Sequence, residues 1–230
     1  MKILIIDDER SIRNSLKEIL ADEGYDVDVA ENGALISLNH PKDALCPYLW
    51  EAEEGFHMME VWNGPMRPAN LKAAQWWHQL LMQGKRIPIV GGSDFHRDKG
   101  PVRFAHPTTW VYTDSPAAED ICKALSRGNS FVTSGPNGVR LDVQGACFGN
   151  VYRSDPGSLW QFEAEGGKAG MFLRLMTDRG VQAEIPFRMD GTARLEIPEE
   201  DWRFAYLTAG YKAGEYFWLR AISNPVYFEY

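Results

Sequence analysis

The sequence has 230 residues, enough for one large domain or two ordinary ones, and 44% of them are hydrophobic while 24% are charged. This composition is typical of globular proteins and excludes a disordered or fibrous chain. The formal net charge of −8 argues against a nucleic-acid partner. A membrane partner is not expected either, because no run approaches the ~18 apolar residues of a membrane span.

The N-terminus and the cysteines indicate the compartment. Met1-Lys2 leads into an apolar strand and two aspartates, which is not the pattern of a signal peptide. Cys46, Cys122 and Cys147 are few and scattered, so we expect reduced thiols rather than disulfides or a zinc site. The sequence therefore predicts a cytoplasmic protein.

The first 33 residues are predicted to form a strand, a helix and a second strand. The first strand, Lys2 to Ile6, ends in Asp7 and Asp8, and the second runs from Tyr25 to Val29. This unit resembles the start of a bacterial response-regulator receiver domain, in the segments Lys2 to Glu9 and Gly24 to Gly33. The resemblance implies that the acidic pair binds magnesium beside a phospho-accepting aspartate.

After Gly33 the receiver pattern ends. No later stretch supplies the acceptor aspartate, the switch Ser/Thr or the Lys of that family. A signalling module without its phospho-acceptor is therefore kept as an alternative function. Asp7 and Asp8 also have a simpler explanation as a helix N-cap and a solvated charge.

A second pattern centres on the segment Gly91-Gly92-Ser93-Asp94-Phe95-His96. The apolar run before it, Ile87 to Val90, is predicted to be a buried parallel strand. Ligands of α/β folds bind at the carboxyl ends of such strands. Asp94 and His96 could there direct one oxygen and one nitrogen at the same divalent cation. His40 follows another apolar run, Ala34 to Leu38, and offers a further nitrogen.

From residue 34 to about 136 the sequence is similar to the C-terminal half of a PHP-type (polymerase and histidinol phosphatase) metal-dependent phosphoesterase, closest to the CehA/McbA-like metallohydrolases. The matching segments are Gly33 to Pro41, Cys46 to Trp50, Met59 to Pro65, Gly91 to His96, His106 to Trp110 and Thr133 to Pro136. The resemblance implies a distorted β/α barrel that hydrolyses phosphoesters or related esters by metal-activated water. By the same resemblance, His40, Asp94 and His96 match metal ligands.

The first metal motif of that family, a His-x-His, is absent, because all five histidines lie at or after position 40. The receiver-like segment stands in its place, so the chain resembles a chimera joined near Asn32-Gly33. We hypothesise that the segment extends the parallel sheet and that Asp7 and Asp8 partly replace the lost ligands. Two imidazoles and one to three carboxylates suit Zn²⁺, Mn²⁺ or Fe²⁺, with Mg²⁺ also possible. The alternative is a metal-free, inactive remnant.

The predicted substrate is a small anionic ester. Arg97 and His106 are the candidate substrate-binding residues, and Arg67 and Arg103 could assist, because a guanidinium matches phosphate oxygens. Surface solvation for the arginines and a loop-fixing role for His106 are the alternatives. Glu60, in the predicted strand Met58 to Trp62, faces either the crevice or a salt-bridge partner.

Two helices are predicted in this half, one from Pro68 to Gly84 and one capped by Ser115, with Pro116 at its first position, and closed by Gly128. Residues 138 to 230 instead show short alternating runs separated by turn signals, which predicts a small β-sandwich. The runs are Val139 to Val143, Trp160 to Ala164, Phe172 to Met176, Ala193 to Ile197 and Tyr216 to Ile222. This part resembles the C-terminal domain of the same metallohydrolases and shows no catalytic set.

Together these patterns predict an α/β fold with a parallel sheet or partial β/α barrel, followed by a small all-β sandwich. The expected divisions are a receiver-like fragment at 1–33, a PHP-like half at 34–136 and a β-sandwich at 137–230. The predicted function is that of a metal-dependent hydrolase of the PHP phosphoesterase type, impaired by the missing His-x-His. A receiver-like signalling module and a non-catalytic scaffold are the alternatives.

Overall fold

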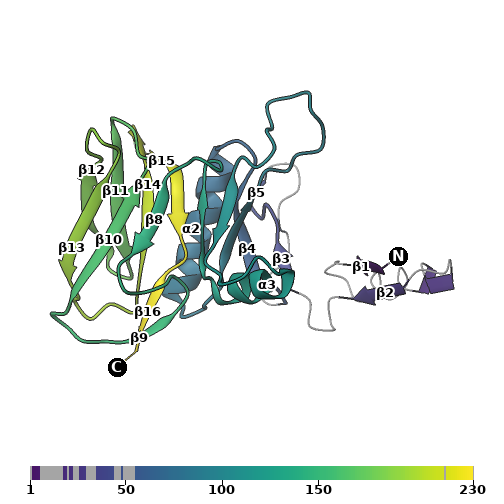
Figure 1. Ribbon diagram of the computed structural model, residues 1–230, viewed down its shortest axis with the longest axis horizontal. Coiled ribbons are helices and arrows are strands. Elements are labelled where there is room, and N and C mark those ends of the chain that lie inside the picture. Colours follow the sequence, from purple (N-terminus) through teal and green to yellow (C-terminus); the bar gives the residue numbers. More distant parts are fainter. Residues whose placement is uncertain are drawn as a thin grey trace.

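β-Strands prevail in the computed structural model, which describes residues 2–5, 18–19, 21–22, 26–29, 35–43, 48, 55–214 and 216–229 (Figure 1). The strands of these residues are β1 (Lys2–Ile5), β2 (Asp26–Val29), β3 (Ser37–Leu38), β4 (Met58–Asn63), β5 (Ile89–Gly92), β6 (Thr108–Val111), β7 (Ser130–Thr133), β8 (Arg140–Val143), β9 (Val151–Arg153), β10 (Leu159–Glu165), β11 (Met171–Thr177), β12 (Gly180–Pro186), β13 (Ala193–Pro198), β14 (Phe204–Ala213), β15 (Tyr216–Ser223) and β16 (Val226–Glu229). The helices are α2 (Pro68–Met82) and α3 (Ala118–Arg127). Neither of these helices has the length and apolarity that crossing a bilayer would require.

The centre of the molecule is an eight-stranded sheet of order β12-β11-β14-β15-β7-β6, in which β16 pairs with β14 and β9. Its pairs are antiparallel except β16 with β9. One face packs against the antiparallel sheet β13-β10-β8. Alternation along β11 directs Leu173 and Leu175 into this interface, where they join Phe162 of β10 and Leu207 of β14. The two sheets thus form a sandwich.

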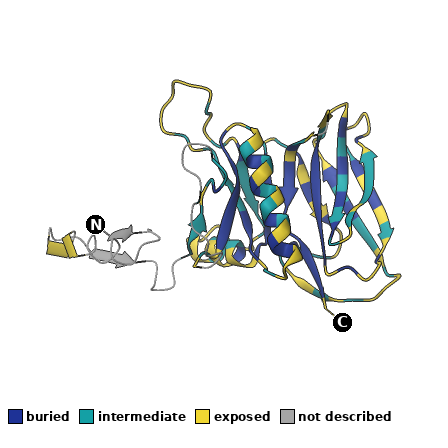
Figure 2. Cartoon of the chain, turned by 180° about the vertical axis from the view of Figure 1, so that it is seen from behind, coloured by how far each residue is buried: buried dark blue, intermediate teal, exposed yellow. Residues whose placement is uncertain are grey.

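The other face of the eight-stranded sheet is covered by α2 and the parallel strands β4 and β5 (Figure 2). Trp77 and Leu80 of α2 are fully buried and belong to one apolar cluster with Tyr206 of β14 and Leu219 of β15. The Trp77 indole donates a hydrogen bond of 2.8 Å to the Ile87 carbonyl oxygen, which ties the helix to the segment before β5. The middle of the central sheet, β14 from Phe204 to Gly210, is therefore buried on both faces.

The predicted α/β parallel sheet or partial barrel is wrong. The chain is mainly β, with a sandwich-like architecture of antiparallel sheets, and the parallel sheet β3-β4-β5 has only three strands. The segments β6 and β7, expected in the α/β half, pair antiparallel with each other, and β7 pairs with β15. Neither segment was predicted to be a strand, and β7 takes its antiparallel partner β15 from the C-terminal half.

β1 and β2 occupy the positions predicted for the first two strands and pair in parallel, with Lys2 opposite Asp26. They form a two-stranded sheet of their own, and neither pairs with β3, β4 or β5 among the described strands. The hypothesis that this segment extends the parallel sheet is therefore wrong for these strands. Asp7 and Asp8 themselves lie outside the described residues.

The helix predicted from Pro68 is confirmed as α2, with proline in its first turn and Gly84 in a left-handed conformation (φ +85°) just beyond its end. α3 starts at Ala118 instead of Pro116, because the Ser115 hydroxyl accepts the Ala117 N–H (3.1 Å) ahead of the helix. Gly128 ends α3 in a left-handed conformation, as predicted.

Side chains join β5 to the eight-stranded sheet. The Thr109 hydroxyl accepts the Gly91 N–H (2.9 Å) and donates to the Gly91 carbonyl (2.8 Å). The buried Asn224 side chain accepts the Ile89 N–H (2.8 Å) and directs its amide nitrogen at the carbonyl oxygens of Ile89 and Ser130. A Cβ at Gly91 would lie 2.4 Å from a Val132 methyl carbon, so the close approach of β5 to β7 requires glycine there.

Candidate functional site

Acidic residues and histidines lie in or directly after the three parallel strands β3, β4 and β5. His40 follows β3, Glu60 lies in β4, and Asp94 follows β5. Parallel pairing places these carboxyl ends at one edge of the sheet. His40 (φ +34°) and Asp94 (φ +53°) are two of the four described non-glycine residues with positive φ. Such strained backbone is concentrated at functional sites, which makes this edge the first candidate.

Glu60 is the centre of a buried hydrogen-bond network at this edge. Its Oε2 accepts the His40 backbone N–H (2.9 Å) and the Asn63 side-chain amide (3.2 Å). Asn63 in turn accepts a hydrogen bond from Arg67 (3.0 Å), which also pairs with Asp43 (2.7 Å). The side chain of Glu60 thus holds the β3 end against β4.

The Glu60 carboxylate has an elevated proton affinity. Burial raises the pKa of Glu60, and the negative charge of Asp94 raises it further, while the hydrogen bonds from His40 and Asn63 oppose the shift. A Cβ at Gly92 would lie only 2.6 Å from Glu60 Oε1, so glycine at this position leaves room for the carboxylate. A buried carboxylate with a raised pKa next to residues of positive φ is typical of functional sites.

The His40 ring provides a second indication. Its Nδ1 is buried and has no hydrogen-bond partner among the described residues. A buried ring nitrogen without a hydrogen-bond partner is costly unless a bound ligand, a water molecule or a metal ion satisfies it. The His40 imidazole therefore has a ring nitrogen that could bind a metal ion, as predicted for this residue.

Asp94 and His96 are placed differently. His96 Nε2 and Asp94 Oδ1 are hydrogen-bonded to each other (2.9 Å), and their side chains are 81% and 46% exposed. In the described part of the chain, no three His, Cys, Asp or Glu side chains are gathered as a bound metal ion requires. Of the five predicted ligands, His40 thus lies beside Glu60, Asp94 faces His96, and Asp7 and Asp8 fall outside the description.

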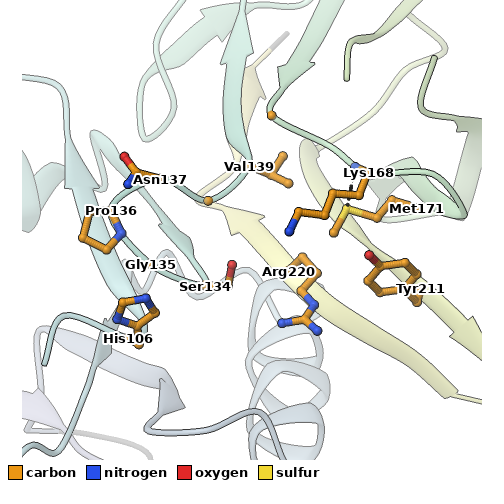
Figure 3. Close-up of a pocket in the computed structure, with 12 residues that line it drawn as sticks. His106, Ser134, Gly135, Pro136, Asn137, Val139, Lys168, Met171, Tyr211 and Arg220 are labelled. Carbon is orange, nitrogen blue, oxygen red and sulfur yellow. Dashed lines mark hydrogen bonds between the residues drawn. The ribbon is translucent and has the colours of Figure 1, made fainter. Parts of the chain in front are cut away.

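Of the two predicted substrate-binding residues, one lines a pocket and the other does not. Arg97 is exposed in the loop after β5 and does not line the pocket of Figure 3. His106 does line it, and its Nδ1 is hydrogen-bonded to the Phe104 carbonyl oxygen (2.9 Å). The pocket has a volume of about 340 Å³ and lies where the end of β7, strand β15 and the turn before β11 meet.

Sequence reasoning missed the residues that give this pocket its charge, Lys168 and Arg220. Both lie in the C-terminal half, where the alternating pattern pointed only to strands. The role of Glu60 was left open, since a lone glutamate in an apolar strand does not reveal its partner. Its link to His40 depends on β3 and β4 being neighbours in the sheet, and the sequence does not record this strand order.

Comparisons with known proteins give no family. No family model matches the sequence, and no curated protein matches it. Among solved structures, the sulfur carrier protein SoxY from Chlorobium limicola f thiosulfatophilum is similar at a TM-score of 0.27 and 11% sequence identity, over 40% of this chain and 80% of that one. At that TM-score the similarity does not establish a shared fold.

Proposed function

We propose that this chain is a divalent-metal-dependent hydrolase of small anionic esters, of the PHP phosphoesterase type and impaired by its missing His-x-His. The observation that carries the proposal is the buried Nδ1 of His40, which lacks a hydrogen-bond partner among the described residues, in a residue whose backbone N–H donates to the buried Glu60 carboxylate. An imidazole nitrogen and carboxylate oxygens are the donors that Zn²⁺, Mn²⁺ and Fe²⁺ accept.

His40, Glu60 and Asp94 are the residues that would hold the ion, and His96 supplies a further donor next to Asp94. Bound divalent metal lowers the pKa of its water towards ~7 and so supplies a hydroxide nucleophile. The affinity is expected to be weak, because only His40 and Glu60 are already together while the Asp94–His96 pair is turned to solvent.

The protein groups have distinct tasks in this proposal. Glu60 would supply a carboxylate oxygen to the ion, and because burial raises the pKa of this carboxyl, metal binding would compete with a proton there. Asn63 and Arg67 fix its position through their hydrogen bonds. His106 contributes a polar group to the pocket in which the anionic part of the substrate would sit.

Metal titration tests the proposal. We expect Zn²⁺ or Mn²⁺ added to EDTA-treated protein to raise the melting temperature and to support hydrolysis of p-nitrophenyl phosphate or bis(p-nitrophenyl) phosphate. The His40→Ala variant should lose both effects. His57→Asn is the matched control, since His57 lies near the same sheet but is exposed, and among the described residues its side chain hydrogen-bonds only the Ile36 N–H (3.0 Å).

Two results would reject the proposal. One is a wild-type melting temperature that no divalent metal shifts, with no metal found in the purified protein. The other is hydrolysis that His40→Ala leaves unchanged. Either result would favour a non-catalytic scaffold, and a stable aspartyl phosphate after treatment with acetyl phosphate would favour the signalling alternative.

A further inference from the structure

The pocket beside His106 carries positive charge only. Its ionisable lining side chains, apart from the phenol of Tyr211, are His106, Lys168 and Arg220, and it contains no Asp or Glu. An adjoining cavity of about 220 Å³ shares His106 and Arg220 and adds Arg103, again without a carboxylate. In a chain of net charge −8, these two neighbouring cavities thus bring Lys168, Arg220 and Arg103 together without an acid in their lining.

Backbone contacts build this arrangement. The Ser134 N–H and the Thr133 hydroxyl both donate to the Arg220 carbonyl oxygen (3.0 and 3.2 Å), which fixes Arg220 beside the end of β7. A Cβ at Gly166 would lie 3.2 Å from the Gly138 carbonyl oxygen, so the turn that carries Lys168 packs closely on the turn after β7. Two segments distant in sequence thereby present their cations to one cavity (Figure 3).

The cations of the pocket differ from several other arginines in their partners among the described residues. Arg67, Arg86, Arg174 and Arg203 each form an ion pair with a carboxylate. Among the described residues, neither Lys168 nor Arg220 forms one, and the Arg220 guanidinium is 5.6 Å from the Tyr211 ring centroid. The Ser134 hydroxyl, which lines the same pocket, forms no hydrogen bond within the described part of the chain. These groups are available to an anion.

We propose that this pocket binds the phosphate group of a small ligand. The Arg220 guanidinium offers a planar fork of donors that matches two phosphate oxygens, Lys168 adds a point charge, and Ser134 adds a hydroxyl donor. A volume of about 340 Å³ accommodates a phosphate with part of its ester group. The adjoining cavity, lined by Trp62, Met66 and Pro107, takes the less polar remainder of the ligand.

This inference goes beyond the proposed function, because phosphate binding by Lys168 and Arg220 needs no metal ion. The adjoining cavity does, however, reach Trp62 and Gly64 near the carboxyl end of β4, the strand that carries Glu60. A phosphoester held by Arg220 would therefore extend towards the candidate metal edge. If that edge is catalytic, phosphate binding in this pocket makes phosphoesters the expected class of substrate.

Calorimetric titration of the full chain with inorganic phosphate, in EDTA and at low ionic strength, tests the inference. We expect Lys168→Gln and Arg220→Gln each to weaken phosphate binding at least about tenfold, and the double variant to weaken it further. Arg220→Lys should lose less than Arg220→Gln, since it keeps the charge and loses the fork. Both side chains are exposed, so the fold should survive these changes.

Matched controls remove the same charges elsewhere. Lys123→Gln on α3 and Arg188→Gln after β12 are exposed, lie outside both cavities and should leave phosphate binding unchanged. The inference is overturned if wild-type protein does not bind phosphate in EDTA, or if the pocket variants bind as well as the controls. Phosphate binding that requires added metal and disappears in His40→Ala would also overturn it, while supporting the proposed function.

Discussion

Replacing Glu60 by glutamine is expected to stabilise the metal-free protein at neutral pH and to remove the stabilisation by divalent metal. Glu60 is 7% exposed and burial raises its pKa, so its charged form is unfavourable in the folded state. Glutamine keeps an oxygen that can accept the hydrogen bonds of His40 and Asn63 without that charge. A metal ligand would be lost, and the metal affinity should fall by at least about 10- to 100-fold.

The pH dependence of stability gives the sign of the effect that Glu60→Gln has on the metal-free protein. Because the folded-state pKa of Glu60 lies above its ordinary value of 4.5, the folded state holds a proton in a window that starts near pH 4.5. The unfolded state has lost its proton there, so the free energy of unfolding falls as the pH rises through this window. Above the folded-state pKa the wild type stays at its lower level, and Glu60→Gln should lack this fall.

Urea unfolding between pH 4.5 and 8, with EDTA and with Mn²⁺ or Zn²⁺, measures both effects. Glu196→Gln on β13 is the control, because Glu196 is exposed and shows neither burial nor contact with His40. If Glu60→Gln lowered the stability of the metal-free protein at pH 7, the carboxylate would be stabilising the fold and the functional interpretation would lose its support. Undiminished stabilisation by metal in this variant would exclude Glu60 as a ligand.

The second large effect is expected for Asn224→Ala, which should destabilise the protein by about 3–5 kcal/mol. Asn224 is 1% exposed and accepts the Ile89 N–H. Its amide nitrogen lies 3.2 Å from the Ile89 oxygen, 3.1 Å from the Ser130 carbonyl oxygen and 2.9 Å from the Ser130 hydroxyl. Alanine would leave these buried backbone groups unsatisfied and would loosen β5 from β7.

Urea denaturation measures this change in the free energy of unfolding. Asn137→Ala, at an exposed position with no side-chain hydrogen bond among the described residues, should change it by less than about 0.5 kcal/mol. Asn224→Asp should also be destabilising, since a carboxylate cannot donate to Ile89 and Ser130. A loss below about 1 kcal/mol for Asn224→Ala would mean that apolar packing alone holds the parallel strands on the central sheet.

The prediction of local elements succeeded where one face of a segment is buried. β10, β11 and β15 coincide with predicted alternating runs, because a strand at a sandwich interface alternates between core and outer face. β14 was missed, although it lies in the middle of the largest sheet. Its residues from Phe204 to Gly210 are all buried, so they show no alternation that could identify a strand.

The candidate site was predicted only in part, and for a related reason. His40 and Asp94 were found because each follows an apolar run, and the strained φ values of both are consistent with a special role for these positions. Glu60 became a candidate only when its hydrogen bond to His40 showed that β3 and β4 are neighbours. His96 is the opposite case. The spacing Asp94-x-His96 predicted it to be a metal ligand, but the structure leaves its side chain exposed.

The sequence by itself determined the helices α2 and α3 and those strands that are buried on one face, such as β10 and β11, because one-sided burial gives the residues of a segment a regular apolar period. It also determined the chemistry on offer, from the imidazole of His40 to the guanidinium of Arg220. Only the tertiary structure decided which strands pair, and hence that β7 joins β15 in an antiparallel sheet and not a parallel barrel. The physical reason is that strand pairing depends on apolar surface contributed by residues far away in the chain, as in the contact of Arg220 with Ser134, and no local pattern records it.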